Sequence, residues 1–432
     1  MIGLVDCNNF YVSCERKLDP SLEGRPVVVL SNNDGVVISR SNEVKALGVG
    51  MAAPAYKYRD IFERNKVVIF SANFNYYLSV TMKVMKIVHD YAPEVEEYSV
   101  DEAFLNLDGW EWKGLRPYMK QLREQLREEV GIPVSVGIAP TKTLAKVASE
   151  LVKKDPKSDG VGDFSTDGDI DTKLRKLPVE DIWGIGRQLS ERLKQGNILT
   201  AYDLKSASEE WIYKNLHMNG LRTVYELRGI RCIDVESRRP VQKSIMRSRS
   251  FGKYITSIEE LREAVAFFAS AGAEALRADG CIARRIGVFV MTNRFNDDPK
   301  YSNTMTRMLP EPTSSTQLFA RHARELLDAI WRDGYKYNKA GAIITDITLA
   351  KNRQPELDHD ERIERATRAI EVVDTINTKY KRGIAALASQ GTNFGWRSKQ
   401  EKLSKAPVEY IPPNLKYRFL THVPITAGDK TM

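Results

Sequence analysis

The order of apolar patterns over the first 165 residues constrains the fold of this chain more than any other feature. The apolar opening Met1-Ile2-Gly3-Leu4-Val5 is typical of a buried strand, and apolar residues recur at helical spacing over 76–91. Two short strands are predicted within 95–107, then an amphipathic helix over 115–130 and a closing strand over 134–138. This β-α-β-β-α-β order predicts a ferredoxin-like sheet whose first and third strands are central neighbours.

Two adjacent acids interrupt the pattern between the middle strands. Asp101 and Glu102 fall at or near the tip of the predicted hairpin, within Tyr98-Ser99-Val100-Asp101-Glu102-Ala103-Phe104. Neighbouring strand residues point to opposite faces, so only one of these carboxylates can point straight into a site. An isolated Asp-Glu pair is most often a turn residue beside a solvated one. Asp6 adds a third acid at the end of the first strand, and the predicted topology lets Asp6 and Asp101 meet on one face.

Three carboxylates in this arrangement suit divalent metal ions. Mg²⁺ prefers six oxygen ligands and usually takes one or two carboxylates, leaving places for phosphate oxygens and water. Asp6, Asp101 and Glu102 can therefore hold two Mg²⁺ ions about 3.5–4 Å apart, as in sites that clamp both oxygens of a phosphoryl transfer. The three acids therefore predict a phosphoryl transfer, but they do not indicate its substrate.

Composition excludes several classes of protein. A chain of 432 residues, 42% of them hydrophobic, is long enough for about two to four folded domains. It contains no run of 18 apolar residues and no basic-then-apolar leader, so we expect a cytoplasmic protein without a membrane segment. Its 4 cysteines form no CxxC pair and have no nearby histidine cluster, which predicts reduced, buried thiols.

Positive charge is concentrated just after the middle of the chain. Lys and Arg number 65 against 57 Asp and Glu, and the net charge of +8 suits an anionic partner. Five bases crowd into one dozen-residue segment: Arg238, Arg239, Lys243, Arg247 and Arg249. The spacing of Arg247 and Arg249 places both on one face of a strand, where they are candidate phosphate ligands. A solvated basic linker is the alternative for the Arg238-Arg239-Pro240 part.

An insert of roughly 55 residues separates the first strand from the first helix, too long for a structureless loop. A hairpin formed by Pro26 to Leu30 and Gly35 to Arg40, followed by a helical stretch from Asn42 to Leu47, predicts a small subdomain. Lys45 in this stretch is a candidate phosphate ligand, and an exposed base is the alternative.

Residues from 171 to about 229 are predicted to be helical around Trp183-Gly184-Ile185-Gly186. Glycines that open a helix bring backbone N–H groups close to an anion, so Gly184 and Gly186 are candidate DNA ligands in an element that resembles a helix-hairpin-helix. A tight turn is the alternative, because Gly-x-Gly alone is a weak signal.

The region 243–350 predicts a second α/β unit. Strands are expected near 246–251, 286–290 and 342–347, with helices over 261–276 and 318–330. From about 351 the sequence is polar, then helix-like over 363–376, and its end is rich in proline, which indicates an attachment segment.

Three motifs in order resemble those of the Y-family, translesion DNA polymerases: Asp6 to Glu15, Ser99 to Phe104, and Gly137 to Lys146. Four more are similar to the UmuC branch, the catalytic subunit of bacterial DNA polymerase V: Ser31 to Gly35, Trp183 to Gly186, Ser248 to Gly252, and Val373 to Asn377. The resemblance implies a palm at 1–18 and 76–165, fingers at 19–75, a thumb at 166–235, a little finger at 243–350 and a C-terminal partner-binding tail at 351–432.

The resemblance also implies an activity: error-prone addition of deoxynucleotides opposite DNA lesions in the SOS damage response. Asp6, Asp101 and Glu102 then become the ligands of two Mg²⁺ ions, with the backbone carbonyl of Cys7 completing one shell. Tyr11, beside Phe10, matches the steric gate that excludes a ribose 2′-hydroxyl.

Two lysines, Lys45 and Lys146, match residues that reach the incoming triphosphate. Asn42 departs from the tyrosine of many relatives, which fits the UmuC branch. A core aromatic at Tyr11 and solvated lysines are the alternatives that the residues alone leave open.

Implied partners are primer-template DNA, deoxynucleoside triphosphates, a processed UmuD dimer, a RecA filament and the sliding clamp, in the bacterial cytoplasm at the nucleoid. The clamp peptide of relatives, Gln-Leu-x-Leu-Phe, is degenerate here: Gln354-Pro355-Glu356-Leu357-Asp358 lacks the terminal aromatic anchor, which argues against clamp binding through it. A nucleotidyl cyclase on a similar palm and a non-catalytic DNA-binding scaffold are the alternative functions.

Overall fold

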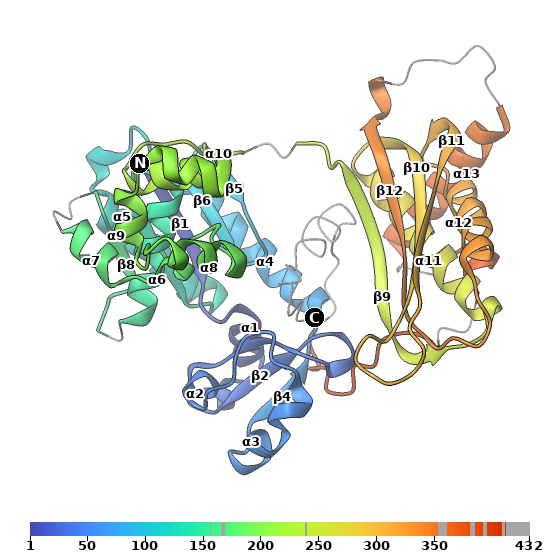
Figure 1. Ribbon diagram of the computed structural model, residues 1–432, viewed down its shortest axis with the longest axis horizontal. Helices are drawn as coiled ribbons and strands as arrows, with labels where there is room; N and C mark the ends of the chain where they lie inside the picture. Colours follow the sequence, from blue (N-terminus) through green and yellow to red (C-terminus); the bar gives the residue numbers. More distant parts are fainter. Residues whose placement is uncertain are drawn as a thin grey trace. The chain divides into compact units, whose positions relative to one another are not determined.

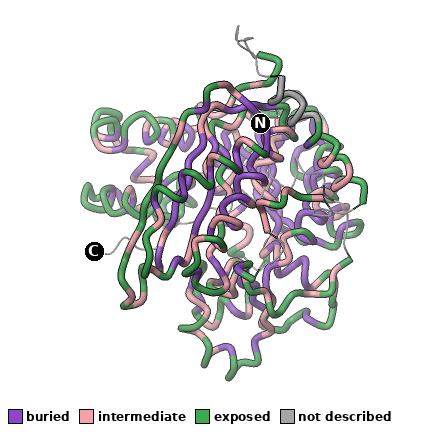
Figure 2. The backbone as a smooth tube through the Cα atoms, turned by 90° about the vertical axis from the view of Figure 1, so that its right-hand side faces the viewer, coloured by how far each residue is buried: buried purple, intermediate pink, exposed green. Residues whose placement is uncertain are grey.

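The computed structural model describes residues 1–155, 157–165, 169–237, 240–352, 361–380, 385–391, 395–407 and 411. The chain forms two compact units, Met1–Glu23 with Tyr77–Arg239 and Gly24–Tyr76 with Pro240–Met432. Both units combine sheets and helices (Figure 1), which confirms the predicted α/β multidomain class. Strands carry much of the buried chain, whereas loops and outer helix faces are exposed (Figure 2).

A five-stranded sheet in the order β5-β6-β1-β7-β8 lies at the centre of the first unit. Its strands are β1 (Ile2–Cys7), β5 (Val95–Glu97), β6 (Glu102–Asn106), β7 (Val134–Ala139) and β8 (Val161–Asp163). β1 pairs antiparallel with both β6 and β7, so the first and third strands are central neighbours, as predicted. The sequence did not indicate β8, which is only 3 residues long and joins β7 in parallel.

Two helices of the first unit match the predicted periodicity: α4 (Phe74–His89) and α5 (Leu115–Gln125), which a π-helical turn over Leu126–Val130 continues. The periodicity did not indicate α1 (Phe10–Leu18) or α6 (Lys142–Lys154). Hydrophobic residues at four- and three-residue spacing give α5 one buried face, formed by Leu115, Met119 and Leu122. The β-α-β-β-α-β order is therefore confirmed through to β7.

Helix α6 packs unusually closely on the sheet. A Cβ at Gly137 of β7 would lie 1.9 Å from the carbonyl oxygen of Ala145, so only glycine allows this approach. Leu4 of β1 packs with Phe104 and Leu144 in one buried cluster, so α6 covers the face of β1 that Leu4 occupies. Because side chains alternate along a strand, Asp6 points to that same face.

The predicted helical region of the first unit consists of α7 (Ile170–Lys176), α8 (Arg187–Gln195), α9 (Ala201–Ser206) and α10 (Glu209–Leu227). Glu226 of α10 is completely buried and accepts hydrogen bonds from the amides of Thr143 (3.1 Å) and Cys232 (2.7 Å). Thr141, the N-cap of α6, donates to the carbonyl oxygen of Glu226 at 2.8 Å. These bonds fix α10 against the start of α6.

The second unit contains a three-stranded subdomain, residues 24–73. Its strands β2 (Val27–Leu30), β3 (Val37–Arg40) and β4 (Val68–Ser71) lie in the order β3-β2-β4, beside the short helices α2 (Asn42–Ala46) and α3 (Arg59–Arg64). β2 and β3 form the predicted antiparallel hairpin, and β4 joins β2 in parallel.

A four-stranded subdomain, residues 244–349, completes the regular part of the second unit. Its strands β9 (Ser244–Ile255), β10 (Cys281–Thr292), β11 (Ser302–Thr313) and β12 (Tyr337–Leu349) lie in the order β11-β10-β12-β9. Helices α11 (Ile258–Ala278) and α12 (Thr316–Ile330) pack on it, and α13 (Glu361–Lys379) follows along the chain. The sequence did not indicate β11, because most of its side chains are exposed and lack an apolar alternation.

All 4 cysteines are free, as predicted; Cys7, Cys14 and Cys281 are buried, and Cys232 is partly exposed. None of the helices in the described part of the chain is both long and apolar enough to span a membrane.

Candidate active site

The three predicted acids lie together where β1 meets β6. Asp6 is only 7% exposed and stands opposite Glu102, the first residue of β6, in the antiparallel register. Asp101 occupies the turn just before β6, and its carbonyl oxygen accepts a hydrogen bond from the amide of Cys7 at 2.8 Å. The register thus pairs Asp6 across the strands with Glu102, because β6 begins at Glu102 and Asp101 lies in the turn before it.

Ser99 shapes this turn. Its hydroxyl donates to the Asp101 carboxylate at 2.5 Å and accepts from the amides of Asp101 (3.3 Å) and Glu102 (3.1 Å). Ser99 was not among the predicted site residues, although serine and aspartate are both common in turns. The turn holds the Asp101 side chain in a fixed position at the edge of the acidic group.

Crowding of negative charge changes the titration of these acids. Burial and the neighbouring charge of Glu102 raise the pKa of Asp6 well above its ordinary value, against the opposing effect of Lys153. The same two causes raise the pKa of Asp101 to about 6. Burial also raises the pKa of the Cys7 thiol, which therefore stays protonated. Such repulsion between close carboxylates favours a cation among them.

Two lysines of α6 lie against these acids. The Lys146 ammonium donates to both carboxylate oxygens of Glu102, at 3.1 and 3.0 Å. Lys153, seven residues later on the same helix face, donates to the Asp6 carboxylate and to Glu150, the latter at 3.0 Å. Lys153 was not among the predicted residues, although its two-turn spacing from Lys146 was a signal that could have identified it.

The donor set fits divalent metal ions. Among the described residues, no three acidic, histidine or cysteine side chains already enclose a common point as a metal cage. The available donors, however, are carboxylate oxygens from Asp6, Asp101 and Glu102, which hard cations such as Mg²⁺ prefer. The two lysine ammonium groups show where positive charge is accommodated beside these acids.

An aromatic pair stands beside the acids on α1 and α4. Tyr11 stacks on Tyr77, with ring centroids 4.6 Å apart and planes inclined by 20°. The Tyr77 hydroxyl donates to the buried carboxylate of Glu15 at 2.6 Å, which fixes the ring under Tyr11. Burial and the charge of Asp101 raise the pKa of the Tyr11 hydroxyl. Phe10, by contrast, is 3% exposed and belongs to the core.

The glycine loop before α8 connects to the acids through aromatic rings. Gly184 is exposed with φ +88°, and Gly186 is the N-cap of α8. Between them and the acids, the Trp183 indole donates to the Tyr98 hydroxyl at 3.2 Å. The Lys146 ammonium lies 4.8 Å from the Tyr98 ring centroid and 5.4 Å from that of Trp183. The loop that contains Gly184 and Gly186, which was predicted to bind phosphate, is thus connected to Lys146 through the rings of Trp183 and Tyr98.

The other predicted ligands lie in the second unit. Lys45 is exposed on α2. Arg247 and Arg249 lie on one face of β9, as predicted, opposite the buried residues Ala342 and Ala340. This is the face that α11 covers, so Arg247 is partly buried, and the more exposed Arg249 projects from an edge strand. Arg238, Arg239 and the segment 354–358 lie outside the described residues.

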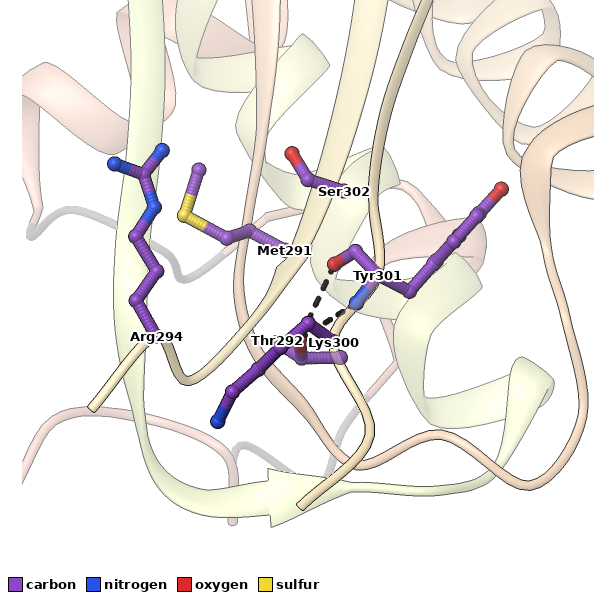
Figure 3. Close-up of a pocket in the computed structure, with 6 residues that line it drawn as sticks. All are labelled: Met291, Thr292, Arg294, Lys300, Tyr301 and Ser302. Atoms are coloured by element: carbon purple, nitrogen blue, oxygen red, sulfur yellow. Dashed lines mark hydrogen bonds between the residues drawn. The ribbon is translucent and has the colours of Figure 1, made fainter. Parts of the chain in front are cut away.

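A separate pocket of about 210 Å³ lies at the end of β10 and β11. Figure 3 shows its two cationic side chains, Arg294 and Lys300, and Tyr301, whose amide donates a hydrogen bond to the Thr292 hydroxyl at 2.9 Å. It contains none of the predicted site residues. Lys300 donates to the carbonyl oxygen of Asn293 at 3.0 Å and so helps to hold its own loop.

Family models match four parts of the chain. The impB/mucB/samB family matches residues 5–150, its C-terminal domain matches 242–357, and the HHH motif of the same family matches 167–198. A domain of unknown function matches 367–407. The protein UmuC of Salmonella typhimurium strain LT2 is 41% identical over 412 residues, which cover 94% of this chain and 97% of UmuC.

The chain belongs to the impB/mucB/samB family. ImpB of Salmonella typhimurium is 38% identical, over 94% of this chain and 96% of ImpB, and DNA polymerase IV of Methanoculleus marisnigri is 32% identical, over 75% and 88%. The fold is similar to a Y-family DNA polymerase chimera built on Dbh, with a TM-score of 0.64 and 21% identity, over 81% of this chain and all of that one.

The predicted resemblance to the UmuC branch of the Y family is confirmed. The chain is a DNA-directed DNA polymerase of the error-prone, translesion type, and its substrates are DNA and nucleotides. Polymerases of this family depend on divalent metal ions. Nothing among these relatives favours the nucleotidyl cyclase alternative.

Proposed function

We propose that this polymerase extends a primer opposite damaged template bases by a two-metal phosphoryl transfer at Asp6, Asp101 and Glu102. The observation that supports it most is the juxtaposition of Asp6 and Glu102 across β1 and β6, with Asp101 in the adjoining turn. Burial, and after it the repulsion from Glu102, raises the pKa of Asp6 and Asp101, and a divalent cation would relieve that repulsion.

Two Mg²⁺ ions are the proposed cofactors. When bound, they would activate the primer 3′-hydroxyl and neutralise the developing charge on the α-phosphate and the leaving pyrophosphate. Asp6, Asp101 and Glu102 would hold them, and the backbone carbonyl of Cys7 would add one oxygen. Ser99 would keep the Asp101 carboxylate oriented through its 2.5 Å hydrogen bond.

Lys146 and Lys153 are proposed to bind the triphosphate. Each ammonium lies on a carboxylate that a metal ion would need, so occupation of the site would release both lysines toward the incoming phosphates. A freed ammonium beside a triphosphate forms a strong, charge-assisted hydrogen bond. Lys45 on α2 is proposed as a third triphosphate ligand.

Tyr11 is proposed as the steric gate, with Phe10 beside it. The stacked Tyr77 ring limits retreat of Tyr11, and a ring that cannot move leaves no room for a ribose 2′-hydroxyl. Discrimination against ribonucleotides would then rest on the two stacked rings and not on the Tyr77 hydroxyl.

DNA would be bound by backbone and side-chain donors in different parts of the chain. Gly184 and Gly186 open α8 and offer N–H groups and the positive end of a helix dipole to a phosphate. Arg247 and Arg249 would bind the duplex from β9. In this proposal 1–18 and 76–165 are the palm, 19–75 the fingers, 166–235 the thumb, 243–350 the little finger and 351–432 a partner-binding tail.

A damage-response setting follows from the family. We propose that the protein works in the bacterial cytoplasm at the nucleoid, with a processed UmuD dimer and a RecA filament as partners in the SOS response. Contact with the sliding clamp would require a peptide other than 354–358, which lacks an aromatic anchor.

Primer extension across a template abasic site tests the proposal. Wild-type protein with Mg²⁺ and four deoxynucleotides is compared with Asp101→Ala, with and without RecA filament and processed UmuD. We expect addition by the wild type alone, while both proteins bind primer-template DNA equally. Equal extension by Asp101→Ala would disprove the metal assignment, and salt-sensitive DNA binding without extension in any reaction would favour the non-catalytic scaffold.

A further inference from the structure

The segment that matches a domain of unknown function, 367–407, makes contacts at three places in the second unit. Its described residues touch α11, the core of the four-stranded subdomain and the end of the three-stranded subdomain. These anchors occur in chain order, so one stretch of polypeptide passes from one subdomain to the other. Each anchor has a defined set of contacts.

The first anchor is an ion pair between α13 and α11. The guanidinium of Arg277, 9% exposed, donates to both carboxylate oxygens of Asp374, at 2.7 and 3.0 Å. Two-point pairing of this kind fixes orientation as well as distance. Three residues later, the Asn377 side chain exchanges two hydrogen bonds with the backbone of Ala385, at 2.8 and 3.0 Å. The motif Val373 to Asn377 therefore fixes the start of the segment.

The second anchor is Trp396. Its side chain is completely buried among Phe251 of β9 and Phe267 and Phe268 of α11, with ring centroids 5.5–6.1 Å away. The Trp396 carbonyl oxygen accepts from the amide of Gly252 at 3.2 Å. A Cβ at Gly252 would lie 2.5 Å from the carbonyl oxygen of Arg397. Only glycine at this position therefore lets β9 and the C-terminal segment approach so closely.

The third anchor is Asn33, in the loop between β2 and β3. Asn33 has φ +60°, and its backbone amide donates to the carbonyl oxygen of Lys399 at 3.1 Å. Its side chain accepts from the Lys399 amide at 2.8 Å and donates to the carbonyl oxygens of Ser250 (3.1 Å) and Phe251 (3.3 Å). One asparagine thus joins the three-stranded subdomain, β9 and the C-terminal segment.

The segment then continues along the end of β4. Ser71 and Lys402 exchange two hydrogen bonds of 2.9 Å: the Ser71 amide donates to the Lys402 carbonyl, and the Ser71 hydroxyl accepts from the Lys402 amide. The Gln400 side chain donates to the carbonyl oxygen of Ala72, also at 2.9 Å. Ser71 is completely buried, so these bonds are shielded from water.

We infer that residues 395–404 form a clasp: a segment that binds both the three-stranded and the four-stranded subdomain and makes them move together. The buried Trp396 secures the clasp on the four-stranded subdomain, and Asn33 with Ser71 secures it on the three-stranded one. This assigns a function to the segment of unknown function. Resting on the proposed function, the clasp makes the fingers follow the little finger whenever the latter binds DNA.

Amide hydrogen exchange on the full-length protein tests the clasp. Asn33→Gly removes the side-chain bonds and keeps a residue that tolerates φ +60°. We expect on the order of tenfold faster exchange at the amides of Ser71 and Lys402, which Asn33 does not touch. Asn32→Gly is the matched control, because Asn32 is its exposed neighbour and should leave both amides protected.

A second variant tests the clasp from its other end. Trp396→Phe should also accelerate exchange at Ser71, although its site of change lies in the core of the four-stranded subdomain. Phe319→Leu, a buried change elsewhere in the same core, controls for general loosening and should leave Ser71 protected. Unchanged exchange at Ser71 in both Asn33→Gly and Trp396→Phe would overturn the inference.

This experiment is independent of catalysis. If the protein fails to extend primers, exchange at Ser71 and Lys402 still reports on the clasp. If extension succeeds, the number of nucleotides added per DNA-binding event should fall several-fold in Asn33→Gly and remain unchanged in Asn32→Gly. Equal product lengths alongside accelerated exchange would reject coupling of the clasp to synthesis, while leaving its structural function intact.

Discussion

Lys146 bonds both carboxylate oxygens of Glu102, at 3.1 and 3.0 Å, and so occupies the same side of that acid that a metal ion would need. Lys153 pairs with one carboxylate oxygen of Asp6. Two of the three acids, Glu102 and Asp6, are thus paired with ammonium groups carried on α6. In the proposed function, binding of metal and of triphosphate would be an exchange of partners, in which each lysine leaves a carboxylate for a phosphate.

The first prediction concerns Lys153. Lys153→Met should lower kcat/KM for deoxynucleotide addition by about 10- to 100-fold, because it removes a charge-assisted hydrogen bond to the triphosphate. Single-nucleotide insertion kinetics measure this. Lys154→Met is the control, since Lys154 is exposed and pairs with Asp181 at 2.9 Å. Equal losses in both variants would show a general effect of α6 charge.

The second prediction concerns metal binding without substrate. Mg²⁺ should raise the melting temperature of the wild type, because a ligand at 100 times its Kd adds about 2.7 kcal/mol to the free energy of unfolding. Glu102→Gln should lose most of this shift, and Lys153→Met should reach it at lower Mg²⁺, since its competing ammonium is gone. Glu150→Gln, which alters only the second contact of Lys153, is the control. A shift that survives Glu102→Gln would place the metal elsewhere.

The third prediction separates two tyrosines. Tyr11→Ala should reduce discrimination against ribonucleotides on the order of a hundredfold, because space opens beneath the sugar. Tyr77→Phe keeps the stacked ring and should preserve discrimination, but it leaves the buried Glu15 carboxylate without its 2.6 Å partner and should cost about 1–3 kcal/mol of stability. Insertion assays with both nucleotide types, and thermal melts, distinguish these outcomes.

An element of the fold could be predicted from the sequence where its apolar residues follow a clear periodicity. The β-α-β-β-α-β order was predictable because β1, β6 and β7 are buried and apolar, whereas β11 was missed because its side chains are mostly exposed. Spacing placed Arg247 and Arg249 on one face of β9 without indicating that α11 covers that face.

Sites that depend on long-range contacts were harder to predict. The three acids came from their positions at strand ends, but the pairing of Asp6 with Glu102 depends on the register of the hairpin. The clasp could not be predicted, because the contact of Asn33 with Lys399 joins residues far apart in the chain. Nothing in the local pattern of either residue indicates its partner.

The fourth prediction concerns DNA affinity. The logarithm of the binding constant should fall linearly with the logarithm of salt concentration, with a slope that reflects the number of phosphates contacted. Replacing Arg247 and Arg249 by alanine together should reduce the slope by up to about two, since each phosphate contact contributes about 0.9. Lys253→Ala is the control, because its ammonium is held by Glu260 at 2.9 Å. An unchanged slope in the double variant would place the DNA elsewhere.

The fifth prediction concerns pH and the ion pair that Asp108 forms with Arg231, at 2.6 Å. The hydrogen bond from Arg231 lowers the pKa of Asp108 below its ordinary value of 3.8. A lowered pKa means that the pair stabilises the fold above that ordinary value and loses this effect as pH falls toward the folded-state pKa. Because Asp108 is half-exposed, the contribution should not exceed about 1 kcal/mol.

Thermal melts of wild type and Asp108→Asn should therefore differ at pH 7 and converge as the pH falls below 4, the region in which the unfolded chain takes up its proton first. Arg231→Met should show a smaller loss at pH 7, because the Asp108 carboxylate also pairs with the Met1 ammonium group. The double variant should lose little more than Asp108→Asn alone, because that change already removes the Arg231 pair. Additive losses, or a difference that persists at low pH, would show that these residues stabilise the fold through contacts other than their ion pair.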